Sequence, residues 1–117
     1  MKSWAEFKRE NPELAMDGMR LLFEIHPHVG YAFLATLRKD GAPRLHPVSL
    51  VTSNDHIYVL ISPNSPKCSD LLRDGRFAMQ AFPFLNNEPG EEFYISGNAV
   101  SIPDITIRKA LIADTEI

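Results

Sequence analysis

The stretch YAFLATLRKDGAPRLHPVSLV, residues 31–51, decides the fold, because from Tyr31 the apolar pattern takes a period of two. This is the spacing of a β-strand with one buried face, whereas the residues before it follow helical spacing. The stretch predicts two strands, Tyr31 to Arg38 and Arg44 to Val51, joined by a tight turn at residues 39–42. An antiparallel hairpin is therefore the starting point of the fold.

The pattern extends this hairpin towards the C-terminus. A second short joint, at residues 52–55, leads into another apolar run, so the first three strands form an antiparallel meander. Beyond the hairpin we expect, in chain order, a third strand (Ile57 to Ser62), a helix (Lys67 to Asp74), a fourth strand (Arg76 to Phe82), a polar loop (86–91), a fifth strand (Glu92 to Ile102) and a last helix that Asp104 caps and that the chain end cuts off at Ile117.

Two helices precede the hairpin. Ser3 and Glu6 have the spacing of a capping box, and the sequence Asn11-Pro12 restarts a helix that we expect to end near residues 26–27. This second helix is amphipathic, with apolar or small residues at helical spacing at Leu14, Gly18, Leu21, Leu22 and Ile25. We therefore expect one mainly β domain over residues 1–117: N-terminal helices in 1–29, barrel strands in 30–102 and a truncated C-terminal helix in 103–117.

Composition excludes several classes of function. The 12 basic and 15 acidic residues give a net charge of −3 without a dense basic run, which argues against nucleic acid as a partner. A single cysteine, Cys68, forms no intramolecular disulfide, and no stretch has the pattern of a secretory signal or a membrane span. We expect a cytoplasmic protein without a membrane partner, and the scattered histidines indicate no metal site.

The loop from Ser62 to Lys67 is suited to an anion. It follows an apolar strand and opens a helix for which Ser65 is a good N-cap and Pro66 fits the first position. Lys67 adds a positive charge where free backbone N–H groups and the helix dipole already favour phosphate. The alternative is a capped helix with a solvated lysine.

Three segments, read together, resemble the pyridoxamine 5′-phosphate oxidase-like family of split β-barrels that bind flavin mononucleotide (FMN). They are residues 35–48, Ser65-Pro66-Lys67 and residues 71–78, and the resemblance covers Gly30 to Ile102. It implies an antiparallel split β-barrel of the FMN-binding type and a homodimer with FMN in a groove between subunits. We expect the dimer contact to include the third and fourth strands and residues 82–85.

The resemblance also implies a set of cofactor-binding residues. Lys67 and Ser65 match the family's phosphate-binding pair. Glu92 aligns with the glutamine that contacts the flavin ring in members of the family. Arg44 shares a strand face with His46, although an exposed strand residue and a structural histidine remain the alternatives for these two. The residues that match the run lining the flavin are His46, Pro47, Val48 and Ser49, and those beside the ring and phosphate are Leu60, Ile61 and Ser62.

This chain departs from the family pattern in three places. His46 and Pro66 stand where members often have arginine, Glu92 cannot donate a hydrogen bond while ionised, and the chain ends before the C-terminal strand. The resemblance implies an FMN-dependent oxidoreductase with an unknown small-molecule substrate, and no catalytic residue is indicated. The alternatives are a deazaflavin-dependent reductase of the same fold and a non-catalytic dimeric module that is cofactor-free or binds haem.

Overall fold

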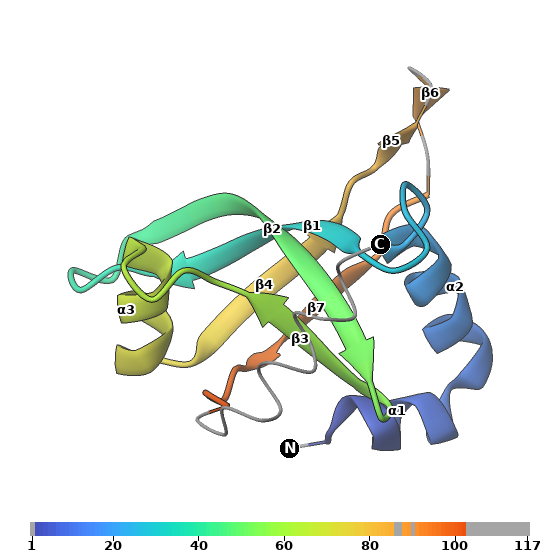
Figure 1. Cartoon of the computed structure of the whole chain (residues 1–117), viewed down its shortest axis with the longest axis horizontal. Helices are drawn as coiled ribbons and strands as arrows, with labels where there is room; N and C mark the ends of the chain where they lie inside the picture. Colours follow the sequence, from blue (N-terminus) through green and yellow to red (C-terminus); the bar gives the residue numbers. More distant parts are fainter. Residues whose placement is uncertain (1, 86–87, 90, 103–117) are drawn as a thin grey trace.

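The structure is a computed structural model that describes residues 2–85, 88–89 and 91–102. The described part is mainly β, with a five-stranded antiparallel sheet, a two-stranded hairpin and three helices (Figure 1). Its elements are α1 (Trp4–Glu10), α2 (Pro12–Leu22), β1 (Gly30–Leu37), β2 (Pro43–Ser53), β3 (His56–Leu60), α3 (Pro66–Arg73), β4 (Arg76–Ala81), β5 (Phe84–Leu85), β6 (Glu88–Pro89) and β7 (Tyr94–Asn98).

The strand order in the large sheet is β3-β2-β1-β4-β7, and every neighbouring pair is antiparallel. The predicted meander of the first three strands is therefore confirmed. Gly41, with φ +88°, lies in the first turn, where Asp40 Oδ1 accepts a hydrogen bond from Ala42 N–H. Asn54 and Asp55 both have positive φ in the second turn, as a two-residue hairpin loop requires.

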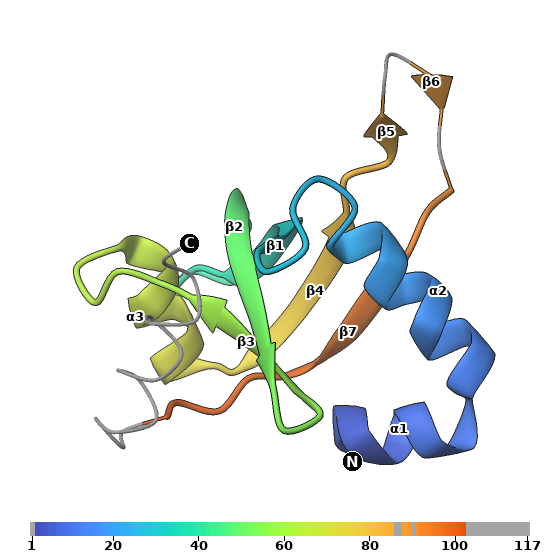
Figure 2. The same ribbon diagram turned by 45° about the vertical axis from the view of Figure 1, so that its right-hand side comes forward.

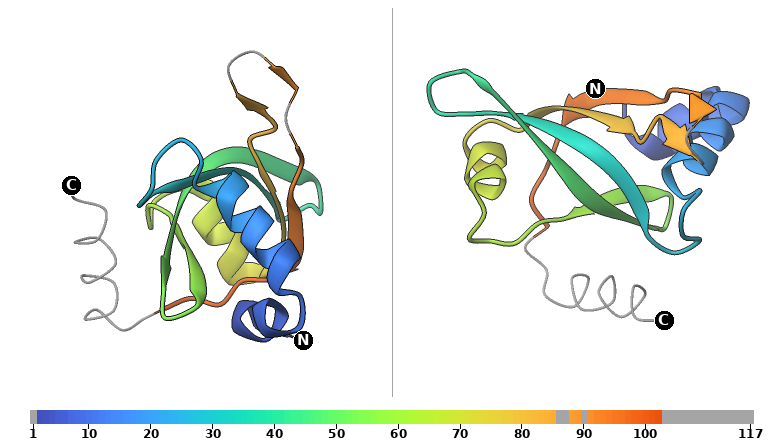
Figure 3. Two further views of the ribbon diagram at one scale, coloured as in Figure 1. Left: turned by 90° about the vertical axis from the view of Figure 1, so that its right-hand side faces the viewer. Right: turned by 90° about the horizontal axis from the view of Figure 1, so that it is seen from above.

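The sheet curls, and helices lie at its two ends (Figures 2 and 3). The concave face and the N-terminal helices enclose the core, which is formed by Leu22, Ala32, Leu34, Val48, Leu50, Met79, Ala81 and Phe93. The helix α3 lies at one end of the sheet and the pair α1 and α2 at the other. This arrangement leaves the convex face of β1 and β2 without a covering helix in the described part of the chain.

The capping signals of the N-terminal helices are confirmed. Ser3 accepts a hydrogen bond from Glu6 N–H, and Pro12 is the first residue of α2. The predicted end of α2 near residues 26–27 is wrong, since the helix ends at Leu22. The chain then reverses tightly, because Gly30 at the start of β1 lies against the Leu22 carbonyl, 3.0 Å from the position of a Cβ.

The predicted buried face of α2 is only partly correct. Leu14 and Ile25 are exposed, and the line that faces the core consists of Ala15, Gly18 and Leu22. Gly18 is required there because the ring of Phe93 packs against it, within 2.6 Å of where a Cβ would stand. The small residue thus lets the helix approach the segment before β7.

The C-terminal half differs from expectation at two places. The predicted fifth strand is shorter, because only Tyr94–Asn98 pairs with β4, and Glu92 precedes the strand. The predicted polar loop contains the strand β6, which pairs with β5 just before the loop. The helix expected from Asp104 lies outside the described residues, and within them no helix has the length and apolar character needed to cross a membrane.

Candidate functional site

The two faces of β2 have different surroundings. The register pairs Pro47 with Phe33 and Ser49 with Tyr31, and cross-strand partners lie on the same face of a sheet. These four residues therefore share the convex face, whereas Val48 and its even-numbered neighbours face the core. The predicted cofactor-binding residues on β2 therefore lie partly on the convex face of the sheet and partly on the face that packs against the core.

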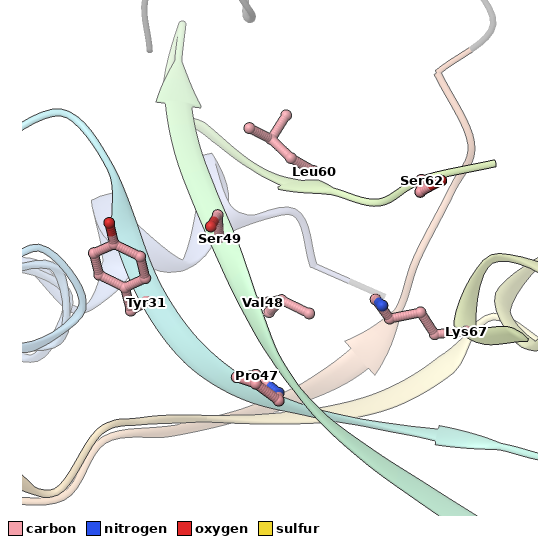
Figure 4. Close-up of a pocket in the computed structure, with 7 residues that line it drawn as sticks. All are labelled: Tyr31, Pro47, Val48, Ser49, Leu60, Ser62 and Lys67. Atoms are coloured by element: carbon pink, nitrogen blue, oxygen red, sulfur yellow. The ribbon is translucent and has the colours of Figure 1, made fainter. Parts of the chain in front are cut away.

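A groove of about 340 Å³ lies between β2, the end of β3 and the start of α3. We call it the β2 groove, and the residues that line it are Tyr31, Pro47, Val48, Ser49, Leu60, Ser62 and Lys67 (Figure 4). Small-molecule sites have volumes of about 300–1,000 Å³, so the groove of one chain is at the lower end of that range. Its apolar part lies along β2 and β3, and its polar end lies at Ser62 and Lys67.

The polar end of the β2 groove is set by the cap of α3. Ser65 Oγ accepts a hydrogen bond from Cys68 N–H at 3.4 Å and donates one to the Ser62 carbonyl at 2.9 Å. This locks the loop, and the Lys67 side chain extends from α3 towards β2 (Figure 4). Among the described residues, Lys67 N–H and Nζ have no acceptor. Lys67 therefore has two unused donors at the positive end of a helix, and its side chain lines the groove.

Six of the eleven predicted cofactor residues meet in this groove: Pro47, Val48, Ser49, Leu60, Ser62 and Lys67. The other five do not line it. The hydroxyl of Ser65 is used as a cap, and Ile61 packs against the core. His46 lies on the inner face with its Nε2 atom buried and without a hydrogen-bond partner in the described part of the chain. Glu92 is exposed ahead of β7.

Arg44 lies in a different environment, in contact with Asp70. Its Nε donates to Asp70 Oδ2 at 2.7 Å, and Thr36 Oγ1 donates to the same oxygen at 2.8 Å. Arg73 Nη2 donates to Asp70 Oδ1 at 3.1 Å. The carboxylate is 1% exposed, so both of its oxygens are satisfied within the protein.

Two opposing effects act on the Asp70 carboxyl. Burial raises its pKa, but hydrogen bonds from Arg44 and Thr36 and the charges of Arg44 and Arg73 outweigh burial and hold the pKa below its ordinary value of 3.8. The group is therefore ionised at neutral pH, and its cations are held in place by it.

Sequence reasoning missed two residues of this region. Tyr31 lines the β2 groove because it pairs with Ser49, and counting back from the turn at Gly41 gives this register. Asp70 carried no signal, since a charged residue in a short helix is usually solvated. It is buried because the face of α3 that carries it lies against Thr36 at the end of the sheet.

The β2 groove can bind a planar or apolar group along β2 and hold an anion at Lys67. Its lining contains no carboxylate, cysteine or histidine, and its ionisable side chains are those of Tyr31 and Lys67. No group of three metal-ligating side chains occurs among the residues that the structure describes. The groove is thus suited to binding and orienting a ligand.

Comparisons with known proteins give the fold and no more. No protein-family model matches the chain, and no curated protein matches it. A solved structure superposes on it with a TM-score of 0.63 and 21% sequence identity, and the match covers 88% of this chain and 69% of the other. The chain therefore shares its mainly β fold with a protein of known structure.

We predict that Asp70→Asn lowers the free energy of unfolding at pH 7 by about 3 kcal/mol, because it leaves Arg44 and Arg73 without a counter-charge. Since the folded pKa of Asp70 is depressed, its contribution is complete above the unfolded pKa of 3.8 and is lost as pH falls through the folded pKa. Urea unfolding between pH 2 and 7 should show a larger loss of stability in the wild type than in the variant, which keeps the other carboxyls of depressed pKa, Asp55 and Asp74.

The matched control is Asp55→Asn, which removes an exposed carboxylate paired with Lys8 and keeps a residue that tolerates positive φ. It should cost no more than about 0.5 kcal/mol at pH 7. Equal losses in the two variants would show that the buried network adds nothing specific.

Proposed function

We propose that the chain is an FMN-binding oxidoreductase with a split-barrel fold, and that FMN occupies the β2 groove. The observation that carries the proposal is the meeting of Lys67 with residues of β2 and β3 in one groove. These segments are separate in the sequence, and the resemblance to the family assigns them all to one cofactor. Their convergence supports a common ligand.

The polar end of the groove fits a phosphate group. Lys67 offers a charged side chain and a backbone N–H, and Ser62 adds a hydroxyl. Arg44 is tied to Asp70 on the other side of α3 and adds no charge here. The proposal therefore assigns the phosphate to Lys67 and the helix start, without the arginines that members of the family often have.

The apolar part of the groove fits a ring system. Pro47 and Leu60 offer aliphatic surface, and Tyr31 offers an aromatic side chain with a hydroxyl at the outer edge. Bound flavin would supply the redox chemistry. The chain's own residues then have three tasks: they anchor the phosphate, orient the ring along β2 and exclude water from one of its faces.

We propose further that the active form is a homodimer that closes the groove. Next to the groove, the convex face carries Phe33 and Leu45, of which Leu45 is 66% exposed. The ring of Phe82 contacts that of Phe33 at a tilt of 32°, with ring centroids 4.6 Å apart, which extends this apolar surface. A second copy of the chain would bury it and cover the open side of the ligand.

Two alternatives make different spectroscopic predictions. A deazaflavin carries a longer acidic tail, for which the groove lining offers a single cation. A haem would give a Soret band, and a cofactor-free module would give neither flavin nor haem absorption. The absorbance spectrum of the purified protein separates these cases.

For the phosphate contact, we predict that Lys67→Ala weakens FMN binding by about ten- to a hundred-fold, the cost of a charge-assisted hydrogen bond. Riboflavin, which lacks the phosphate, should lose little affinity. The measurement is a titration of flavin fluorescence quenching with both ligands.

Lys8→Ala is the control, because Lys8 lies on α1 at the other end of the sheet and its loss changes the net charge equally. The proposal fails if the wild type binds no flavin, or if Lys67→Ala weakens both ligands to the same extent.

For the dimer, we predict that the wild type sediments as a dimer at micromolar concentration and that Leu45→Glu raises the dissociation constant at least about tenfold. An unpaired charge would have to be buried in the interface, although Leu45 is exposed in the single chain and the fold should be unaffected.

Leu72→Glu, at an equally exposed leucine on α3, should leave the dimer intact. A monomeric wild type, or equal effects of the two substitutions, would contradict the proposed interface.

A further inference from the structure

A second groove, of about 500 Å³, lies on the other side of α3. It separates α3 from the turn between β1 and β2, and we call it the hairpin groove. No residue that lines it also lines the β2 groove. Its charged lining residues are Arg38, Lys39, Asp40, Arg44, Asp70 and Arg73.

The charges of the hairpin groove do not cancel. Four cations and two carboxylates give a formal charge of +2, in a chain whose net charge is −3. Asp70 is buried beneath the groove with both oxygens occupied, and Asp40 accepts a hydrogen bond from the turn backbone. Within the described part of the chain, the side chains of Arg38 and Lys39 have no acceptor or ion-pair partner, although the Arg38 backbone N–H donates to the Ala42 carbonyl. Arg44 and Arg73 share the charge of Asp70, so the excess positive charge includes the unpaired side chains of Arg38 and Lys39.

Buried Asp70 also orients the groove's arginines. Arg44 uses only Nε to reach the carboxylate, and the structure shows no acceptor for its two terminal nitrogens among the described residues. Arg73 uses Nη2 for Asp70 and Nη1 for the Leu37 carbonyl at 3.4 Å, so its position is fixed from two sides. A guanidinium held by a buried partner is pre-organised, which lowers the entropy cost of binding a ligand.

We propose that the hairpin groove is an anion site for a phosphate-type dianion, either free phosphate or the phosphate of a small monoester. The excess charge of +2 matches a dianion, and the terminal nitrogens of Arg44 with the exposed side chains of Arg38 and Lys39 provide several donors around one groove. Four cations around one concavity do not form the extended basic track that a nucleic acid backbone needs. This site is separate from the flavin phosphate site at Lys67.

The test is an NMR titration with inorganic phosphate at pH 8, carried out on Lys67→Ala so that the β2 groove makes no contribution. The double variant Arg38→Gln/Lys39→Gln removes two exposed charges that the folded state does not use. The matched control is Lys8→Gln/Arg9→Gln, an adjacent basic pair on α1 at the opposite end of the sheet. A parallel titration with acetate, a monoanion, tests whether the groove prefers a dianion.

We expect saturable shifts of amides in residues 38–44 and 66–73, at least about tenfold weaker phosphate binding in Arg38→Gln/Lys39→Gln, and unchanged binding in Lys8→Gln/Arg9→Gln. Acetate should bind at least about tenfold more weakly than phosphate. The proposal is overturned if these amides show no saturable shift, if both double variants lose affinity equally, or if acetate binds as well as phosphate. Because no flavin is used, the result is independent of the proposed function.

Discussion

The buried carboxylate of Asp70 is the interaction on which the arrangement of this protein depends. Removal of a carboxylate from water costs several kcal/mol unless its oxygens are fully paired. Here Thr36 on β1, Arg44 on β2 and Arg73 on α3 pair both oxygens. The charged network therefore links the helix to the end of the sheet, in addition to the packing of Leu71 against the core.

The contacts of Asp70 with Thr36, Arg44 and Arg73 determine which charged side chains lie on each side of α3. They hold Lys67 and the start of the helix against β2, which completes the β2 groove. They also hold Arg44 at the hairpin groove, so this arginine adds no charge to the β2 groove. Lys67 is left as the cation of the β2 groove, while the arginines gather around the hairpin groove. A short helix thus separates two sites of different electrostatic character.

Much of the fold was predictable because its signals are local. The change of period at Tyr31, the turn at Gly41 and the cap at Ser65 each act within a few residues, and all three are confirmed. The end of α2 at Leu22 was not predictable from the local pattern, and its carbonyl lies against Gly30, which is further along the chain. The site of Arg44 was not predictable either. The sequence correctly indicates that Arg44 shares a strand face with His46, but only the structure shows that the Asp70 carboxylate binds it.

The most direct test of this account is amide hydrogen exchange in Thr36→Val, which removes one donor to Asp70 from a residue that lines neither groove. Loss of a hydrogen bond to a charged group should open α3 more often. The account predicts that amides of residues 70–74 exchange roughly tenfold faster while those of β2 and β3 are unchanged. Unchanged exchange in α3, or an equal acceleration throughout the sheet, would contradict it.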